Sequence, residues 1–388
     1  MAVKRSIRLK EVGVSIRRFN YPPSKYLIGR VGLSTEYGYT FVTDENGFSL
    51  STIPSLVGDR KIFFAGGSSI EASYCDINKR VPFVFQEKLL EVGIPCTCFN
   101  MGVSGATSLN LFNVMMNKLI HCSGDMIFFV PSNDVLALEL ESGYLNGTRY
   151  YTNLVPDTGE NYAPGHFDKN KSQIFPMLRM ISSFCREFGF NLYVSGVIYK
   201  KPNKKFSEIN LMVENFCLEN GIKYISIENY PSDSFYDSVH LTSKGSCYVA
   251  NRVFDEYINI NKKIKEVEIK KKINLDDFTY FDISKSSSIS LFVDVECMDD
   301  VLPSSLLAYF DFSQAGKIDR EQLYEVGLSF SKIVGPYKYL ELPGSGRRCV
   351  MQYTFRFPDA VENLGIGLKK WHSRNSYKVH SAIAYYRA

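Results

Sequence analysis

Four short segments of the sequence contain the residue types that acyl-transfer chemistry requires. Serine hydroxyls follow a pair of glycines at residues 66–69, and a serine and a glycine stand together at residues 104–105. A side-chain amide lies within residues 132–134, and Asp237 and His240 are three residues apart. A serine hydroxyl is a weak nucleophile unless a base removes its proton, and an acid that orients this base completes the set. The segments therefore predict an activated serine, provided that the fold brings them together.

Apolar runs that end just before these segments predict the strands that would position them. The runs cover residues 61–65, 95–100, 125–130, 191–197 and 223–227, and they alternate with helical patterns at 81–92, 108–120, 173–188, 206–218 and 243–257. Apolar strands that alternate with helices are typical of a parallel sheet covered on both faces. The carboxyl ends of such strands meet at one edge, where ligands bind. The sequence therefore predicts a doubly wound α/β domain over residues 61–258, with all four segments at one edge.

The order of the four segments resembles the SGNH, or GDSL-type, hydrolase family, which includes carbohydrate O-acetyl esterases and O-acetyltransferases. Ser68 matches the nucleophile of this family, and Asp237 and His240 match its Asp-x-x-His pair. The Ser68 backbone N–H, Gly105 and Asn133 match the donors that stabilise the oxyanion. The resemblance implies a flavodoxin-like parallel sheet and an acyl enzyme on the serine, with no cofactor and no metal.

Two residues depart from the pattern of this family. Gly67 stands where the family most often has Asp, and Pro131 replaces a glycine two residues before the asparagine. Neither change removes a reacting group, so the departures concern rate and substrate more than mechanism. Single motifs also have ordinary structural explanations: Ser68 could be a turn residue or a helix cap, and Asp134 is expected to hydrogen-bond its loop rather than to catalyse.

The rest of the chain predicts three further parts. Residues 1–60 have eight Lys or Arg among the first thirty and little periodicity, which predicts a basic leader packed on the catalytic domain. Its basic face is expected to be solvated, and an anionic partner is the alternative. Residues 259–272 contain six lysines and predict a linker. Apolar and polar residues then alternate at 289–297, 351–357 and 377–385. This period of two predicts an antiparallel β-sandwich over residues 273–388.

Two regions outside the four segments could bind a substrate. Residues 135–171 are predicted to form a lid-like loop, in which Tyr150 and Tyr151 could line a pocket or simply pack the loop down. Trp371 in the β-domain could stack on a sugar ring, although a lone Trp is more often a core residue. At the level of fold, a β-sandwich attached to such a domain resembles a carbohydrate-binding module.

Composition excludes several classes of protein. The 388 residues are 45% hydrophobic and 22% charged, which excludes intrinsic disorder, and the net charge of +4 is too small to indicate a nucleic-acid partner. No run approaches the roughly eighteen apolar residues of a membrane span, and no apolar stretch near the N-terminus indicates a secretory signal. The nine scattered cysteines, with no Cys-x-x-Cys spacing, predict reduced thiols in the cytoplasm rather than a zinc site.

The sequence therefore predicts a cytoplasmic enzyme that acts on O-acyl groups, above all O-acetyl groups, of a carbohydrate through an acyl enzyme on Ser68. Water as the acceptor makes an esterase, whereas a sugar hydroxyl makes an O-acetyltransferase, for which acetyl-CoA could be the acyl donor. The alternatives are a lipase or thioesterase with the same mechanism and a non-catalytic glycan-binding protein on the same fold. Nothing in the sequence indicates the oligomeric state.

Overall fold

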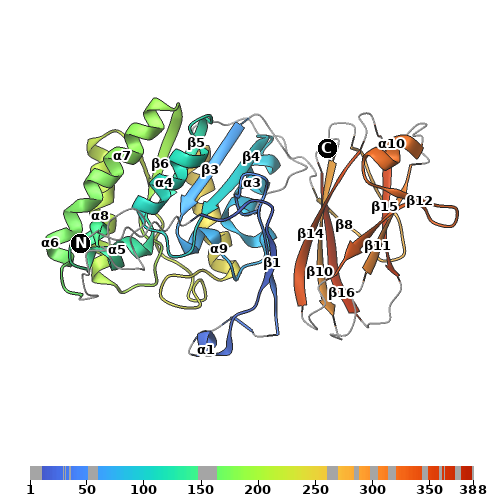
Figure 1. Ribbon diagram of the computed structural model, residues 1–388, viewed down its shortest axis with the longest axis horizontal. Coiled ribbons are helices and arrows are strands. Elements are labelled where there is room, and N and C mark those ends of the chain that lie inside the picture. Colours follow the sequence, from blue (N-terminus) through green and yellow to red (C-terminus); the bar gives the residue numbers. More distant parts are fainter. Residues whose placement is uncertain are drawn as a thin grey trace, which may run out of the picture.

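The computed structural model contains an α/β part, a C-terminal part made of two antiparallel sheets, and a short N-terminal hairpin (Figure 1). It describes residues 11–28, 30, 32–34, 36–50, 60–146, 164–259, 270–283, 288–297, 305–312, 320–342, 348–357, 361, 363–371 and 377–386. In these ranges no helix combines the length and the apolar character that crossing a membrane would require.

Five parallel strands form the sheet of the α/β part. They are β3 (Arg60–Gly66), β4 (Cys96–Gly102), β5 (Gly124–Phe129), β6 (Phe190–Ser195) and β7 (Lys223–Ile225). The spatial order β4-β3-β5-β6-β7 is that of flavodoxin-like sheets, so the predicted parallel sheet is confirmed. The chain changes direction across the sheet between β3 and β5. In this fold a ligand is expected where these two strands end.

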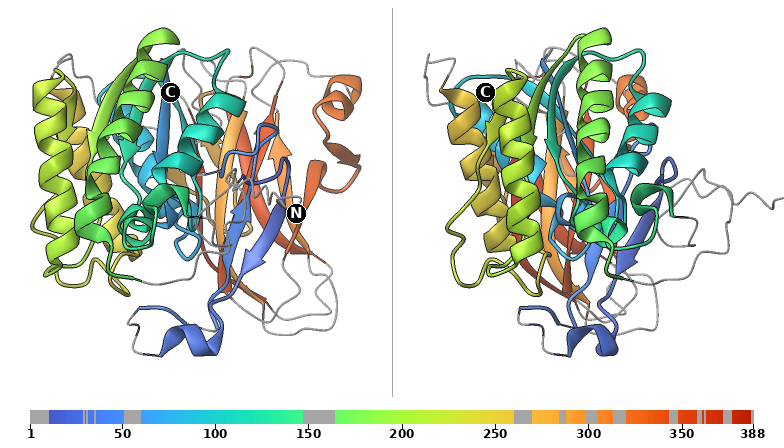
Figure 2. Two further views of the ribbon diagram at one scale, coloured as in Figure 1. Left: turned by 60° about the vertical axis from the view of Figure 1, so that its left-hand side comes forward. Right: turned by 90° about the vertical axis from the view of Figure 1, so that its left-hand side faces the viewer.

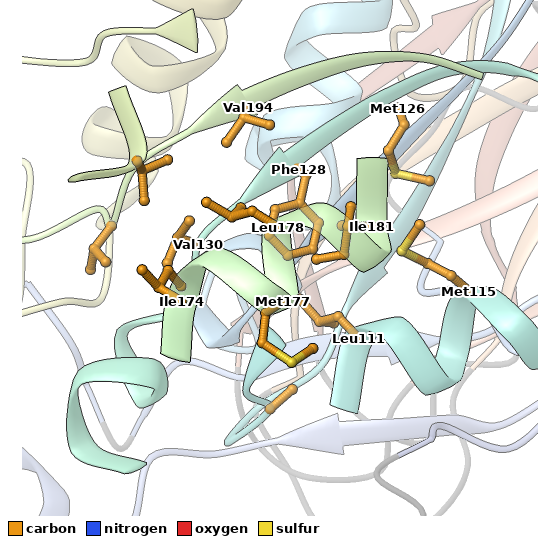
Figure 3. Close-up of a cluster of buried hydrophobic side chains, with 14 of the residues drawn as sticks. Leu111, Met115, Met126, Phe128, Val130, Ile174, Met177, Leu178, Ile181 and Val194 are labelled. Atoms are coloured by element: carbon orange, nitrogen blue, oxygen red, sulfur yellow. The ribbon is translucent and has the colours of Figure 1, made fainter. Parts of the chain in front are cut away.

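Helices cover both faces of this sheet (Figure 2). One face carries α3 (Val81–Glu91) and α9 (Ser243–Ile258), and the other carries α4 (Ser108–Lys118), α7 (Ile174–Glu187) and α8 (Lys204–Glu219). Each face of the sheet has its own apolar core, and alternate residues of β3 point into the two. Ile62 and Phe64 belong to the first core, beneath α3 and α9, and Phe63 and Ala65 belong to the second, beneath α4, α7 and α8. Figure 3 shows the second core, where helix residues such as Leu178 surround Phe128 of β5.

Two antiparallel sheets form the C-terminal part. In spatial order, the first contains β14 (Arg348–Arg356), β10 (Ser288–Cys297), β16 (Tyr377–Tyr385) and β8 (Lys270–Lys272), and the second contains β12 (Ser329–Ser331), β13 (Gly335–Glu341), β11 (Ser305–Asp311), β15 (Leu364–Trp371) and β9 (Thr279–Phe281). Helix α10 (Arg320–Glu325) precedes β12. The inner faces of both sheets share one apolar core, which contains Leu291 and Met351 of the first sheet and Leu306 and Leu368 of the second. This is the packing of a β-sandwich.

The basic leader forms an antiparallel pair of strands, β1 (Arg17–Asn20) and β2 (Tyr39–Val42), with the short helix α1 (Ser24–Leu27) between them. The pair lies between the two larger parts (Figure 1). The Thr40 hydroxyl donates a hydrogen bond to the Val350 carbonyl of the first sandwich sheet at 2.7 Å. The buried Arg80 of the α/β part donates to the Thr40 carbonyl at 2.8 Å. The leader therefore contacts both parts of the chain.

Two predicted boundaries differ from the structure. The last three residues of the predicted linker 259–272 form β8 at the edge of the first sandwich sheet, so the sandwich begins before residue 273. Lysines are typical of edge strands, and three in a row conceal the alternation that would have revealed one. The predicted loop 135–171 begins inside a helix, α5 (Ser132–Leu138), and contains α6 (Phe167–Asn170) near its end. Tyr150 and Tyr151 lie outside the described residues.

Candidate active site

Ser68, His240 and Asp237 form a hydrogen-bonded chain at the carboxyl edge of the parallel sheet. The Ser68 Oγ lies 2.8 Å from His240 Nε2, and His240 Nδ1 lies 2.7 Å from Asp237 Oδ2. One ring nitrogen thus contacts the hydroxyl, and the other contacts the carboxylate. In this geometry the imidazole can take the serine proton while the carboxylate stabilises the imidazolium. The structure brings together the three residues that the sequence singled out.

Ser68 is placed by a tight turn between β3 and the four-residue helix α2 (Ser68–Glu71). Glycine is required where this turn approaches β4: a Cβ on Gly102 would lie 2.1 Å from the Glu71 backbone nitrogen. The helix can therefore lie directly on the strand end, which fixes the position of its first residue. Because a helix has no internal acceptors for its first N–H groups, the Ser68 N–H is available to a ligand.

His240 is held from two sides. Asp237 Oδ1 accepts hydrogen bonds from the backbone N–H groups of Val239 and His240 at 2.9 and 2.8 Å, which closes the loop that carries both residues. The Tyr236 ring stacks on the imidazole with 5.5 Å between the ring centroids and 4° between the planes. The loop thus determines the orientation of the imidazole.

The carboxylate that orients His240 is held in its ionised form. Burial raises the pKa of Asp237, but hydrogen bonds from the His240 ring and from backbone N–H groups outweigh burial and lower this pKa to about 2. Arg30 of the leader lies nearby, with its Nη2 3.6 Å from Asp237 Oδ2. At neutral pH the carboxylate is therefore charged and can stabilise an imidazolium ion.

A cavity of about 630 Å³ opens in front of the serine. Gly105 and Asn133 line it together with Ser68 and His240, so the predicted oxyanion donors and the nucleophile face one space. Gly105 has φ +73°, a left-handed conformation that favours glycine. Asn133 stands in the first turn of α5, directly after β5. The two strand ends on either side of β3 thus provide one candidate donor each.

The two departures from the SGNH pattern lie against each other. A Cβ built on Gly67 would lie 3.3 Å from Pro131 Cβ, which is closer than ordinary side-chain contact. Pro131 is the residue before α5 and has φ −66°, which suits its ring. The ring therefore occupies the space beside residue 67, and Asn133 still faces the cavity.

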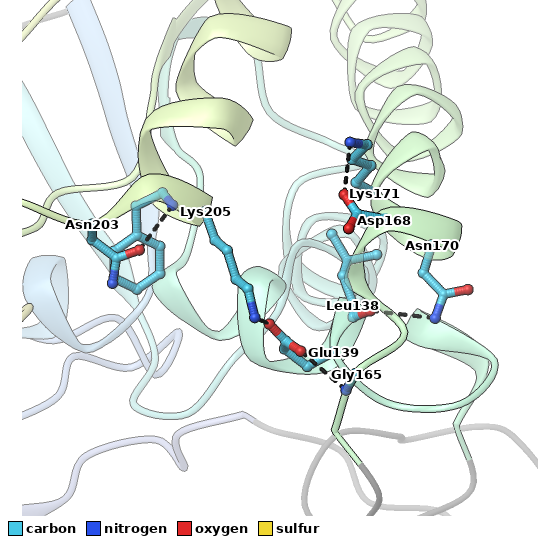
Figure 4. Close-up of polar contacts among 9 residues, drawn as sticks. Leu138, Glu139, Gly165, Asp168, Asn170, Lys171, Asn203 and Lys205 are labelled. Carbon is cyan, nitrogen blue, oxygen red and sulfur yellow. Dashed lines mark hydrogen bonds and ion pairs between the residues drawn. The ribbon is translucent and has the colours of Figure 1, made fainter.

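Helix α5, which carries Asn133, is anchored at both ends. Near its start the buried Asp134 accepts hydrogen bonds from the Ser108 backbone N–H at 2.7 Å and from the Ser108 hydroxyl. Beyond its end Glu139 forms an ion pair with Lys205 of α8 (Figure 4). Asp134 was expected to hydrogen-bond its own loop, but its bonds instead reach Ser108 at the start of α4.

The structure places in the cavity two residues that were not predicted, and it places one predicted residue outside the cavity. Arg18 and Asn20 of β1 line the cavity around Ser68, and the basic character of the leader was the only indication of them. Trp371 lies in β15 of the sandwich and is not among the residues that line this cavity. In the described part of the chain, no three His, Cys, Asp or Glu side chains are grouped to hold a metal ion.

Comparisons with known proteins complete the description of the site. No family model and no curated protein matches the chain. Among solved structures, a lipase/acylhydrolase from Enterococcus faecalis is similar to 54% of this chain over 99% of its own, at 14% identity and a TM-score of 0.38. The acetylxylan esterase Axe2 from Geobacillus stearothermophilus matches 55% of this chain over 100% of its own, at 13% identity and a TM-score of 0.40. A putative lipolytic protein of the G-D-S-L family from Desulfitobacterium hafniense matches 51% over 99%, at 11% identity and a TM-score of 0.36.

Proposed function

We propose that the protein is a serine-dependent enzyme that removes or transfers O-acyl groups, above all O-acetyl groups, of a carbohydrate. The observation that carries this proposal is the chain of short contacts from Ser68 Oγ through His240 to Asp237 at the wall of an open cavity. His240 takes the proton of Ser68 as the hydroxyl attacks the ester carbonyl. The Ser68 and Gly105 N–H groups and the Asn133 amide then stabilise the oxyanion. When the tetrahedral intermediate collapses, the ester C–O bond breaks and His240 gives its proton to the leaving alcohol or thiol; the acyl enzyme then passes its acyl group to water or to a sugar hydroxyl.

The lining of the cavity favours a small acyl group on a polar molecule. Besides the catalytic set, its wall carries the hydroxyl groups of Ser73, Ser104, Ser132 and Ser238. The large apolar or aromatic side chains that line it are Leu136, Phe206, Val239, Tyr74 and Tyr236. A lipase or thioesterase needs a continuous apolar channel for a long chain, whereas hydroxyl-rich walls suit the hydroxyl groups of a sugar.

The outer face of the second sandwich sheet offers a second place for a glycan. Leu307 pairs with Tyr339 on one side and with Lys369 on the other, so these three side chains lie on one face of the sheet. Trp371 is two residues after Lys369 in β15 and therefore lies on the same face. Their ring centroids are 6.4 Å apart, and Tyr339 is 44% exposed. Trp371 is half-buried, so the exposed Tyr339 ring is the one that can stack on the C–H face of a sugar, with Trp371 beside it. We assign Trp371 to this surface rather than to the catalytic cavity.

The proposal is tested by following acetyl groups. Purified protein is incubated with an activated acetyl ester, with and without an acetylatable oligosaccharide, and Ser68→Ala is the control. Acetate release defines an esterase, and acetyl on the sugar defines an O-acetyltransferase, for which acetyl-CoA is then tried as the donor. Activity that rises with acyl length beyond propionyl would instead identify a lipase or thioesterase. If the wild type reacts with a fluorophosphonate no faster than Ser68→Ala, the protein is a non-catalytic binding protein and the proposal fails.

A further inference from the structure

The N-terminal hairpin places a cation in the candidate active site. Arg18 of β1 lines the same cavity as Ser68 and His240, although the three residues are far apart in the sequence. It pairs across the hairpin with Phe41, and its guanidinium carbon lies 4.3 Å from the centroid of the Phe41 ring. Phe41 is completely buried, whereas Arg18 is exposed. Stacking on a buried ring holds the guanidinium in place at the cavity that Arg18 lines.

The charge of Arg18 is not balanced by a carboxylate of the described chain. Of the acids beside the cavity, Asp237 is engaged by His240 and Arg30. Glu71 is buried and accepts hydrogen bonds from the hydroxyl groups of Ser73, at 2.6 Å, and Ser104. No described Asp or Glu lies within ion-pair distance of Arg18. The cavity therefore presents one arginine whose charge no described carboxylate neutralises.

We propose that Arg18 selects the substrate by binding a carboxylate of an acidic sugar that carries the ester. This inference rests on the function proposed above and narrows its substrate class. A guanidinium offers two parallel N–H donors that match a carboxylate, and such charge-assisted pairs are stronger than neutral hydrogen bonds. Asn20, two residues along the same strand and also in the cavity wall, can bind a neighbouring sugar hydroxyl. The residues at the sheet edge would then catalyse the reaction, and the leader residues would determine which ester binds.

The test compares two acetyl esters that differ only at C6, a carboxylate in one and a hydroxymethyl group in the other: a mono-O-acetylated methyl glucuronoside and the corresponding glucoside. Their affinities for Ser68→Ala are measured by calorimetry, which needs no turnover, and their kcat/KM values are measured on the protein with Ser68. Arg18→Gln should lower the preference for the acidic ester by about ten- to a hundredfold in both assays, because one charge-assisted pair is lost. Arg18→Lys keeps the charge without the paired donors and should lose part of this preference.

Arg17→Gln is the matched control, because Arg17 is also exposed, stands next to Arg18 on β1 and does not line the cavity. Arg17→Gln should change the preference for the acidic ester by less than about twofold relative to the protein with Arg17, as expected for a residue that makes no specific contact with the ester. Equal affinity of Ser68→Ala for the two esters would overturn the inference, as would an equal loss of preference in Arg17→Gln. Binding of coenzyme A that depends on Arg18, without binding of the glucuronoside, would also overturn it by assigning the arginine to an acyl donor. Failure of the wild type to cleave either ester would instead count against the proposed function, because the calorimetric comparison is independent of turnover.

Discussion

The cavity around Ser68 has two walls that are built in different ways. The wall at the sheet edge is connected by short hydrogen bonds, which run from Ser68 through His240 to Asp237. The second wall comes from the leader hairpin, where Arg18 stacks on Phe41. A hydrogen-bonded network fixes atoms to the precision that bond making requires, whereas a stacked side chain fixes a charge. The difference suggests a division of labour: changes in the first wall should affect every ester, and changes in the second should affect the choice among them.

The largest effect is expected at the acid of the sheet-edge wall. Asp237→Asn keeps the shape of the residue but removes the charge that orients His240, so turnover should fall by roughly three to four orders of magnitude. The loss should be equal for charged and neutral esters. Asp233→Asn is the control, since Asp233 lies in the same loop and is exposed, where it pairs with Lys244. A variant at Asp237 that retains a tenth of the wild-type turnover would show that this residue is not the orienting acid.

A smaller effect is expected at the oxyanion donor. Asn133→Ala removes an amide that is close to the oxyanion only in the tetrahedral state, so KM should change little while kcat falls by about a hundred- to a thousandfold, or roughly 3 to 4 kcal/mol. Asn133→Asp has the same shape without the donor and should lose at least as much. A fluorophosphonate should still label Ser68, only more slowly. A loss below about fivefold in Asn133→Ala would remove this residue from the oxyanion hole.

The two walls also differ in how well the sequence predicts them. The strands of the sheet edge were predicted to within a few residues, because buried parallel strands are continuous apolar runs between helices. The order of the segments around them, together with their resemblance to the SGNH pattern, selected Ser68, Gly105, Asn133, Asp237 and His240. The leader was not predictable in this way: β1 and β2 have four residues each and are separated by eighteen others, so no local pattern shows that Arg18 faces the cavity.

The sandwich falls between these cases. Strands β10, β14 and β16 were predicted from their alternation, which arises where one face of a strand is buried and the other is more polar. Strand β11 reads Ser-Leu-Leu-Ala-Tyr-Phe-Asp, with five apolar residues in succession, so it shows no period of two. In β15 the buried Leu364, Ile366 and Leu368 alternate with glycines instead of polar residues, which weakens the pattern. Strands of this kind are recognised from their pairing with neighbouring strands and not from their own sequence.

A third prediction concerns the contact between Gly67 and Pro131, which distinguishes this sheet edge from the SGNH pattern. Gly67→Asp should lower the free energy of unfolding by about 1–3 kcal/mol, because its Cβ meets the Pro131 ring. Pro131→Gly in the same chain should restore part of this loss, with a coupling of at least about 0.5 kcal/mol. Denaturant titrations of the two single variants and the double variant measure the coupling, and Gly67→Ala separates the effect of volume from that of charge. Additive losses would mean that the two departures are unrelated.

A pH-dependent effect is expected behind the sheet-edge wall, at Asp134. Burial raises the pKa of this carboxyl to about 7, and the two hydrogen bonds from Ser108 offset burial only in part. The folded state therefore holds a proton that the unfolded state releases near pH 4. Because the folded protein binds more protons than the unfolded chain in this range, this residue makes stability fall as pH rises from about 4 to about 7 and leaves it level above.

Asp134→Asn should remove that slope, because an amide keeps an oxygen for the Ser108 N–H and does not titrate. The difference in unfolding free energy between Asp134→Asn and the wild type should therefore shift in favour of the variant between about pH 5 and pH 8, by at most about 3 kcal/mol. Denaturant titrations at the two pH values measure it, with Asp255→Asn, an exposed carboxylate of α9, as the control. Since both states of the wild type are protonated below about pH 4, the difference between variant and wild type should stop changing with pH there. An equal difference at both pH values would show that Asp134 is ionised in the folded protein and that the start of α5 is held by a buried charge instead of a buried acid.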